Sequence, residues 1–177
     1  MKFIRSNFLK FKIEIERFYV HFYRFIKGFP IKKSIVVSEQ IFVGGQFRAN
    51  KIPKLIEWGI TGILSMRTRY PKKIKDRLDI EFLNLPTFDT TAPTLEQLHA
   101  GVSFIKSHIE RNGKVYIHCR MGEGRGPTMA AAYFMYEGMT LEDSLESILK
   151  IRPFLKITHD QRQRLGEFAK EFLKHNS

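Results

Sequence analysis

The stretch VYIHCRMGEGRGPT, residues 115–128, passes from a β-branched and aromatic run directly into a glycine-rich turn. Residues 114–118 are typical of a buried strand, and the residues from Pro127 onward indicate a helix over 127–136. A glycine loop between a strand and a helix aims successive backbone N–H groups at one point, and the helix adds the positive end of its dipole. The segment therefore predicts an anion-binding loop within an α/β fold.

Short strands and helices alternate along most of the chain. Apolar, β-branched runs predict strands over 34–38, 41–43, 62–66, 80–85 and 114–118. Helical spacing and capping residues predict helices over 52–58, 94–112, 127–136, 140–151 and 158–174. This alternation predicts one α/β domain over 31–177, with a central, mostly parallel sheet of about five strands flanked by helices.

The N-terminal segment, residues 1–30, is predicted to form a separate amphipathic helix. Its apolar stripe has helical spacing and comprises Ile4, Phe8, Phe11, Ile15, Phe18, Phe22, Phe25 and Phe29. Its other faces carry the basic residues Arg5, Lys10, Lys12, Arg17 and Arg24. The charges of Lys10, Lys12, Glu14, Glu16 and Arg17 interrupt any signal-peptide core. The helix either packs against its own domain or lies on an anionic membrane as an interfacial helix.

The net charge of the 177-residue chain is +12, from 30 Lys and Arg residues against 18 Asp and Glu residues. Such a surface favours anionic partners, and because no nucleic-acid-binding module is evident, phosphorylated substrates and anionic lipid are expected in place of nucleic acid. One cysteine and six scattered histidines show no metal-ligand spacing, so neither metal nor cofactor is expected. The sequence predicts a cytoplasmic protein, peripheral on a membrane if the N-terminal helix is interfacial, and leaves the oligomeric state open.

The glycine loop also carries the residues for nucleophilic chemistry. Cys119 stands at its start, where N–H groups and a helix end favour a thiolate, and Arg125 lies six residues later, where its guanidinium can hold two phosphate oxygens. Asp89, in the proline-flanked loop LPTFDTTAP, can protonate a leaving oxygen. The alternatives are a buried structural thiol for Cys119 and a turn or capping aspartate for Asp89.

The predicted substrate-binding residues are those of the loop itself: Arg120, Met121, Gly122, Glu123, Gly124 and Arg125. His118 and Thr128, which flank this loop, are predicted to support it, with His118 buried and bonded to backbone. A basic segment at 66–77 follows another predicted strand and either draws an anionic substrate toward the site or is a solvated loop; its residues are Arg67, Arg69, Lys72, Lys73, Lys75 and Arg77.

The pattern His118-Cys119-x5-Arg125 resembles the motif of cysteine-dependent protein tyrosine and dual-specificity phosphatases. The resemblance extends over about residues 35–175, through IFVGGQF, EWGITGILSM, the acid loop, VYIHC and the KIRPFL…Q tail. Within that family the chain is most similar to the mitochondrial phosphatidylglycerophosphate phosphatase group. The resemblance implies Cys119 as nucleophile, Arg125 as phosphate clamp and Asp89 as acid and then base.

Two positions depart from the pattern of the family that the chain resembles. Gly126 stands where the family usually has Ser or Thr, whose hydroxyl helps the thiolate leave, and Thr128 comes two residues too late to take its place. Glu123 stands where lipid-specific members tend to have a basic residue, and it is expected to place a negative charge beside the substrate's path. That charge argues against a polyphosphoinositide substrate.

The sequence therefore predicts a phosphomonoester hydrolase that works through a cysteinyl-phosphate intermediate. The favoured substrate is an anionic phospholipid phosphate, such as phosphatidylglycerophosphate or a phosphoinositide. The alternatives are a protein tyrosine or dual-specificity phosphatase, which Glu123 favours, and a phosphate-binding pseudophosphatase module, which Gly126 favours.

Overall fold

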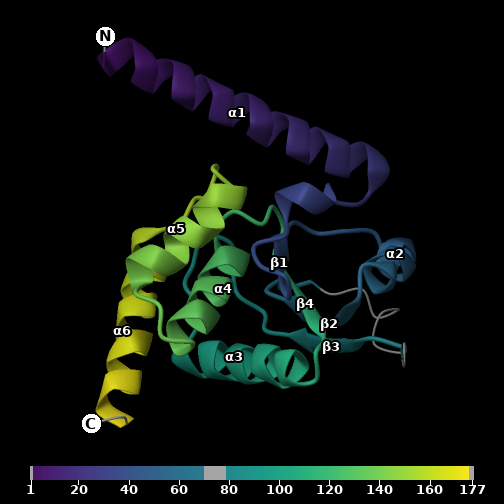
Figure 1. Ribbon diagram of the computed structural model, residues 1–177, viewed down its shortest axis with the longest axis vertical. Coiled ribbons are helices and arrows are strands. Elements are labelled where there is room, and N and C mark those ends of the chain that lie inside the picture. The colour runs from purple at the N-terminus through teal and green to yellow at the C-terminus, as the bar shows by residue number, and fades with distance from the viewer. Residues whose placement is uncertain (1, 70–78, 176–177) are drawn as a thin grey trace.

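A parallel sheet of four strands forms the centre of this computed structural model, which describes residues 2–69 and 79–175 (Figure 1). The strands are β1 (Ile41–Gly44), β2 (Ile60–Ser65), β3 (Glu81–Asn84) and β4 (Lys114–His118). Their spatial order is β1-β4-β2-β3, and every neighbouring pair is parallel. Consequently the carboxyl ends of all four strands meet at one edge of the sheet.

Helices cover both faces of the sheet, because alternate side chains of each strand point to opposite faces. One face packs against α3 (Leu95–Glu110), α4 (Arg125–Tyr136), α5 (Leu141–Ile151) and α6 (His159–His175). The other face packs against α2 (Ile52–Glu57) and residues 29–35. In β1, for example, Ile41 and Val43 join the first core and Phe42 joins the second. The predicted α/β fold class is confirmed.

The described sheet has four strands where about five were predicted, because residues 34–38 form no strand. The first residue of this segment instead ends a short 3-10 helix, η1 (Lys32–Ser34). A second 3-10 helix, η2 (Ala49–Lys51), comes after β1 and leads into α2. Ser34 belongs to η1, and its hydroxyl donates to the Ile31 carbonyl at 2.8 Å. The chain then reverses so soon before β1 that only one antiparallel bridge forms, between Val36 and Phe42.

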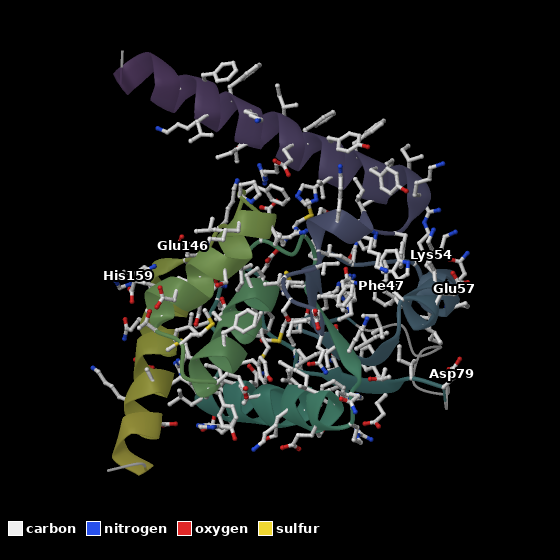
Figure 2. The ribbon with its side chains drawn as sticks, in the orientation of Figure 1. Phe47, Lys54, Glu57, Asp79, Glu146 and His159 are labelled. Atoms are coloured by element: carbon white, nitrogen blue, oxygen red, sulfur yellow. The ribbon has the colours of Figure 1, made fainter. Side chains whose placement is uncertain are left out.

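The N-terminal helix, α1 (Lys2–Lys27), lies along one side of the molecule (Figure 1). It ends at Gly28, whose φ of +66° is a conformation that glycine adopts without strain. Its aromatic rings point away from the remaining fold (Figure 2), and the stripe residues Phe8, Phe11, Ile15, Phe18, Phe22 and Phe25 are all more than half exposed. The helix therefore contacts the domain through its polar face, whereas these stripe residues do not pack against it; the stripe residue Phe29, which follows the helix, is buried. Among the described helices, none is long and apolar enough to cross a membrane.

Candidate active site

The anion-binding loop lies at the carboxyl edge of the sheet, between the end of β4 at His118 and the start of α4 at Arg125. A cavity of about 190 Å³ opens beside it. The predicted residues that line this cavity are Asp89, Cys119, Met121, Glu123, Gly124 and Arg125, and four further lining residues are Thr90, Lys156, Thr158 and Gln161. Arg120 and Gly122 were also predicted to bind substrate but are not among these lining residues; Arg120 is exposed and Gly122 is buried.

The loop curls around the sulfur of Cys119. The backbone N–H of Gly122 donates to Cys119 Sγ at 3.2 Å, and the thiol side chain is 3% exposed. Gly122 has a φ of +76°, and a Cβ atom at this position would collide with the backbone of Gly44. Only glycine therefore permits this curl, which, together with the amino end of α4, stabilises negative charge at the sulfur.

Arg125 and Asp89 meet directly at the cavity. The Arg125 guanidinium is 5% exposed, and one of its terminal nitrogens, Nη1, donates to the carbonyls of Thr87 at 2.7 Å and Met66 at 3.3 Å. Its other terminal nitrogen, Nη2, lies 2.7 Å from Asp89 Oδ1. The two carbonyls fix the plane of the guanidinium, while the Asp89 side chain, 61% exposed, occupies the edge that a phosphate would bind.

His118 lies behind the loop as a neutral ring. Its ring packs between Tyr116 and Phe47, and Nδ1 lies 3.4 Å from the carbonyl oxygen of Cys119. Burial lowers the pKa of His118 to about 3, against the opposing effect of that carbonyl, and nearby arginines lower it further. A ring that is neutral at pH 7 and bonded to backbone can orient the loop, as the sequence suggested, but carries no proton to the substrate.

Thr128 supports the loop through a different contact. Its hydroxyl donates to the Gly124 carbonyl at 3.0 Å and the side chain is fully buried. The hydroxyl is therefore committed to the loop backbone and does not replace the one missing at Gly126. A Cβ atom built at Gly126 would lie 3.5 Å from the backbone nitrogen of Cys119, so a side chain at that position would begin beside the cysteine.

Glu123 lines the cavity, where the sequence placed a negative charge beside the substrate's path, and that charge is paired. Its carboxylate is 8% exposed and accepts hydrogen bonds from Arg17 at 2.8 Å and from the His21 ring at 2.5 Å. Burial raises the pKa of Glu123, but the bonds from His21 and Arg17 outweigh burial and bring the pKa to about 2. Glu123 is therefore ionised and paired with α1.

Two buried polar residues from the C-terminal half hold the site together, although the sequence assigned them no role. Arg152 is 1% exposed and donates to the carbonyls of Gly122 at 2.9 Å and Met121 at 3.3 Å. Gln161 is fully buried, and its amide donates to the Thr91 carbonyl at 2.9 Å, which ties the acid loop to α6. Their only sequence signal was the KIRPFL…Q segment of the family resemblance.

The basic segment at 66–77 is described only in part. Arg67 is half-buried near the site. Burial is the largest cause that lowers its pKa, and the positive charges of Arg125 and Arg120 lower it further. Arg69 is exposed. The other predicted basic residues, Lys72, Lys73, Lys75 and Arg77, lie outside the described residues.

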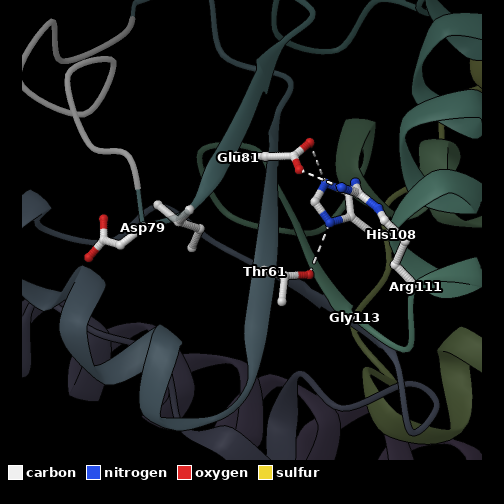
Figure 3. A pocket seen from close by; sticks show the side chains of 7 residues that line it. Thr61, Asp79, Glu81, His108, Arg111 and Gly113 are labelled. Carbon is white, nitrogen blue, oxygen red and sulfur yellow. Dashed lines mark hydrogen bonds and ion pairs between the residues drawn. The ribbon is translucent and has the colours of Figure 1, made fainter.

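A second polar cavity, of about 260 Å³, lies at the opposite, amino end of the strands (Figure 3). Thr61 Oγ1 lies 2.9 Å from His108 Nδ1, and Glu81 lies between His108 at 3.4 Å and Arg111 at 2.9 Å. Burial lowers the pKa of His108. These contacts join α3 to β2 and β3, so the cluster is explained by the packing of the fold.

The fold and the site together define a class of protein. A buried cysteine at the start of a strand–loop–helix anion site, an arginine six residues later and an aspartate from another loop are the parts of a cysteine-dependent phosphatase. The family described as dual specificity phosphatase, catalytic domain, matches residues 41–171, and the chain belongs to this family of enzymes.

Known relatives and solved structures agree with this family. Phosphatidylglycerophosphatase and protein-tyrosine phosphatase 1 of Rattus norvegicus is 32% identical over 126 residues, which span 66% of this chain and 65% of the rat protein. Phosphatidylglycerophosphate phosphatase PTPMT2 of Arabidopsis thaliana is 26% identical over 140 residues, 76% of this chain and 61% of that protein. The crystal structure of PTPMT1 in complex with PI(5)P covers 80% of this chain and 97% of its own, at 28% identity and a TM-score of 0.75. The chain thus spans somewhat less than two thirds of the rat and Arabidopsis relatives.

Proposed function

We propose that this phosphatase hydrolyses the phosphomonoester of an anionic phospholipid, such as phosphatidylglycerophosphate or a phosphoinositide. The observation that carries the reaction is the single cavity that brings Cys119, Arg125 and Asp89 together. The choice of lipid is supported by the names of the relatives and by the phosphoinositide in the PTPMT1 structure. It is also supported by the net charge of +12, which favours an anionic surface.

The proposed first step transfers the phosphoryl group to the enzyme. The phosphate displaces the Asp89 carboxylate from Arg125 Nη2 and binds to the guanidinium and the loop N–H groups. The displaced Asp89 carboxylate takes up a proton from solvent. The Cys119 thiolate sulfur then attacks phosphorus and forms the S–P bond, while the ester P–O bond breaks and the protonated Asp89 gives its proton to the departing oxygen. The exposed loop position of Asp89 suits this exchange, because its side chain moves into solvent while the phosphate replaces it as the partner of the buried Arg125 guanidinium.

The proposed second step releases inorganic phosphate. Asp89, now a carboxylate, accepts a proton from water as the water oxygen attacks phosphorus, and the S–P bond breaks to regenerate the thiolate. No side-chain hydroxyl assists the departing sulfur from position 126, so this step is proposed to limit turnover. No metal or cofactor takes part in the proposal.

A protein phosphatase activity is the second candidate, because the name of the rat relative includes protein-tyrosine phosphatase. The argument for it from Glu123 has lost its basis, since that carboxylate is paired with Arg17. We place the enzyme peripherally on a membrane surface, in contact through α1, and on the cytoplasmic side because its single catalytic thiol must stay reduced.

The test is a comparison of phosphate release from three substrates by the full chain. These are phosphatidylglycerophosphate, phosphatidylinositol 5-phosphate and a phosphotyrosine peptide, each with the Cys119→Ser variant as the blank. The proposal predicts a kcat/KM at least tenfold higher on one of the lipids than on the peptide. The opposite ranking would assign a protein phosphatase, and phosphate binding without release on all three would assign a pseudophosphatase.

A further inference from the structure

The two faces of α1 differ in what they contact. The polar face is bonded to the phosphate loop, and the apolar face is exposed. We propose that α1 is a docking helix whose apolar face binds an anionic phospholipid bilayer while its polar face holds the loop 119–125 in its active shape. The part of this proposal in which the bilayer supplies the substrate rests on the proposed function. The docking and the contact with the loop stand on their own observations.

The first contact of the polar face is a two-point ion pair with Glu123. Arg17 Nε lies 2.8 Å from Glu123 Oε1 and Arg17 Nη2 lies 3.1 Å from Oε2, and the His21 ring reaches Oε1 at 2.5 Å. The same Glu123 lines the substrate cavity, and its backbone carbonyl accepts from the Lys156 N–H at 2.8 Å. A loop residue is thus fixed by α1 from one side and by the segment before α6 from the other.

The second contact is made by Arg24, about two turns after Arg17 along α1. Its Nη1 donates to the carbonyl of Arg120 at 2.8 Å and to that of Gln46 at 3.2 Å, and its Nη2 lies 3.2 Å from Met121 Sδ. These groups belong to the loop and to the segment after β1. The helix α1 thus contacts three residues of the loop, through the backbone carbonyl of Arg120 and the side chains of Met121 and Glu123.

The opposite face of α1 is an apolar surface with no cover in the described structure. Its exposed side chains, each more than half accessible, are Phe8, Leu9, Phe11, Ile15, Phe18, Tyr19, Phe22, Phe25 and Ile26. A continuous aromatic face of this size marks a site of interaction. Because the polar face is already bonded to the loop, the helix cannot turn to bury these rings against its own domain.

Charge decides which occupant fits this apolar face. The α1 sequence has seven Lys or Arg residues against two Glu, a net charge of +5. Two copies of such a helix would repel each other on contact, whereas anionic headgroups would attract the basic residues as the rings enter the acyl boundary. An interfacial helix of 26 residues is about 39 Å long, so it offers a broad footprint on a bilayer.

Docking through this face would bring the bilayer close to the active site. A helix with its side chains is about 10 Å across, so the headgroup layer and Glu123 would lie on the two sides of a single helix. The phosphate of a lipid in that layer would therefore be near the cavity. The contacts of Arg17 and Arg24 would hold the loop ready for it.

The docking half of the proposal is tested on vesicles that contain phosphatidylglycerol and phosphatidylcholine but no phosphomonoester lipid. The triple variant Phe11→Ser, Phe18→Ser, Phe22→Ser is compared with the full wild-type chain and with Leu149→Ser, an exposed apolar residue on α5. We expect the triple variant to bind at least tenfold more weakly in co-sedimentation, with Leu149→Ser unchanged. All three proteins should hydrolyse a soluble aryl phosphate at the same rate.

Two results would overturn the docking proposal. One is vesicle binding by the triple variant equal to wild type. The other is a wild-type chain that ignores vesicles but forms a dimer that the triple variant does not form, because the apolar face would then be an interface between copies. A wild-type enzyme that binds vesicles but releases no phosphate from any lipid would instead refute the proposed substrate and leave docking intact.

The loop half of the proposal is tested with Arg17→Gln on the soluble aryl phosphate, where no membrane is involved. We expect kcat/KM to fall about tenfold, Arg17→Lys to recover part of the loss, and Lys12→Gln, an exposed α1 residue, to match wild type. The double variant Arg17→Gln, Glu123→Gln should have a higher kcat/KM than the single variant Arg17→Gln, because no unpaired carboxylate then remains by the loop. Unchanged kcat/KM in a folded Arg17→Gln protein would refute the link between α1 and the loop.

Discussion

Replacing Gly126 by serine restores the hydroxyl that the phosphatase family usually places after its arginine, and it should speed the second chemical step. The structure has room for the change. A Cβ atom at this position would lie 3.5 Å from the Cys119 nitrogen and 3.6 Å from the His118 carbonyl carbon, which are ordinary contacts. Gly126 lies within α4 and is not one of the glycines with positive φ, so serine fits the backbone without strain.

The size of the effect follows from the strength of one hydrogen bond to a developing thiolate. A hydrogen bond to a charged group is worth about 1.5–3 kcal/mol, which corresponds to a rate increase of about 10- to 150-fold in the step where the S–P bond breaks. Turnover should rise until the first step becomes limiting. Serine is also a better helix former than glycine by roughly 0.5 kcal/mol, so the melting temperature should not fall.

Rapid-mixing kinetics with a chromogenic aryl phosphate measure both steps. Wild type should show a burst of aryl alcohol close to one equivalent per site, followed by a slow steady state. Gly126→Ser should show a smaller burst and a faster steady state. Gly126→Ala is the matched control, because it adds the same Cβ atom without the hydroxyl. A wild-type enzyme without a burst, or a serine variant no faster than the alanine variant, would refute the argument.

Three further predictions concern individual residues of the site. Cys119→Ser should lose turnover by at least a thousandfold and keep phosphate-ester binding, measured by calorimetry, because the loop N–H groups and Arg125 remain; activity near wild type would exclude this cysteine as nucleophile. Asp89→Ala should lower kcat/KM on an alkyl phosphate about a hundredfold more than on an activated aryl phosphate, because only the poor leaving group needs the proton; equal losses would argue against the acid role. The pKa of Glu123, about 2 in the folded protein against an ordinary value of 4.5, is lowered, so its pairing should stabilise the fold fully above pH 4.5 and lose that effect as the pH falls toward 2. Thermal melts of wild type and Glu123→Gln should therefore differ most at pH 6, differ less at pH 3 and converge only near pH 2, and a constant difference would contradict this assignment.

Local sequence determined the phosphate loop and the order of most elements. The strand, the glycine turn and the helix around Cys119 depend on neighbouring residues, and the backbone conformation at Gly122 is one that only glycine accepts there. The capping box of α3 is equally local, and both of its bonds, between Thr94 and Gln97, are present. Asp89 was predicted from a nearby strand and loop, and its meeting with Arg125 followed from the parallel sheet, which gathers strand ends at one edge.

Tertiary structure alone decided what Glu123 and α1 do. Arg17 and Glu123 are 106 residues apart, so no sequence spacing could show that the one neutralises the other. The amphipathic pattern of α1 predicted an apolar and a polar face, but it did not predict which of the two faces contacts the domain. The answer depended on a buried carboxylate in the loop, because a charge removed from water must be paired, and this requirement outweighed the burial of the aromatic face. Sequence thus determined the chemistry of the loop, and the fold decided which helix stands over it and which of its faces is left exposed.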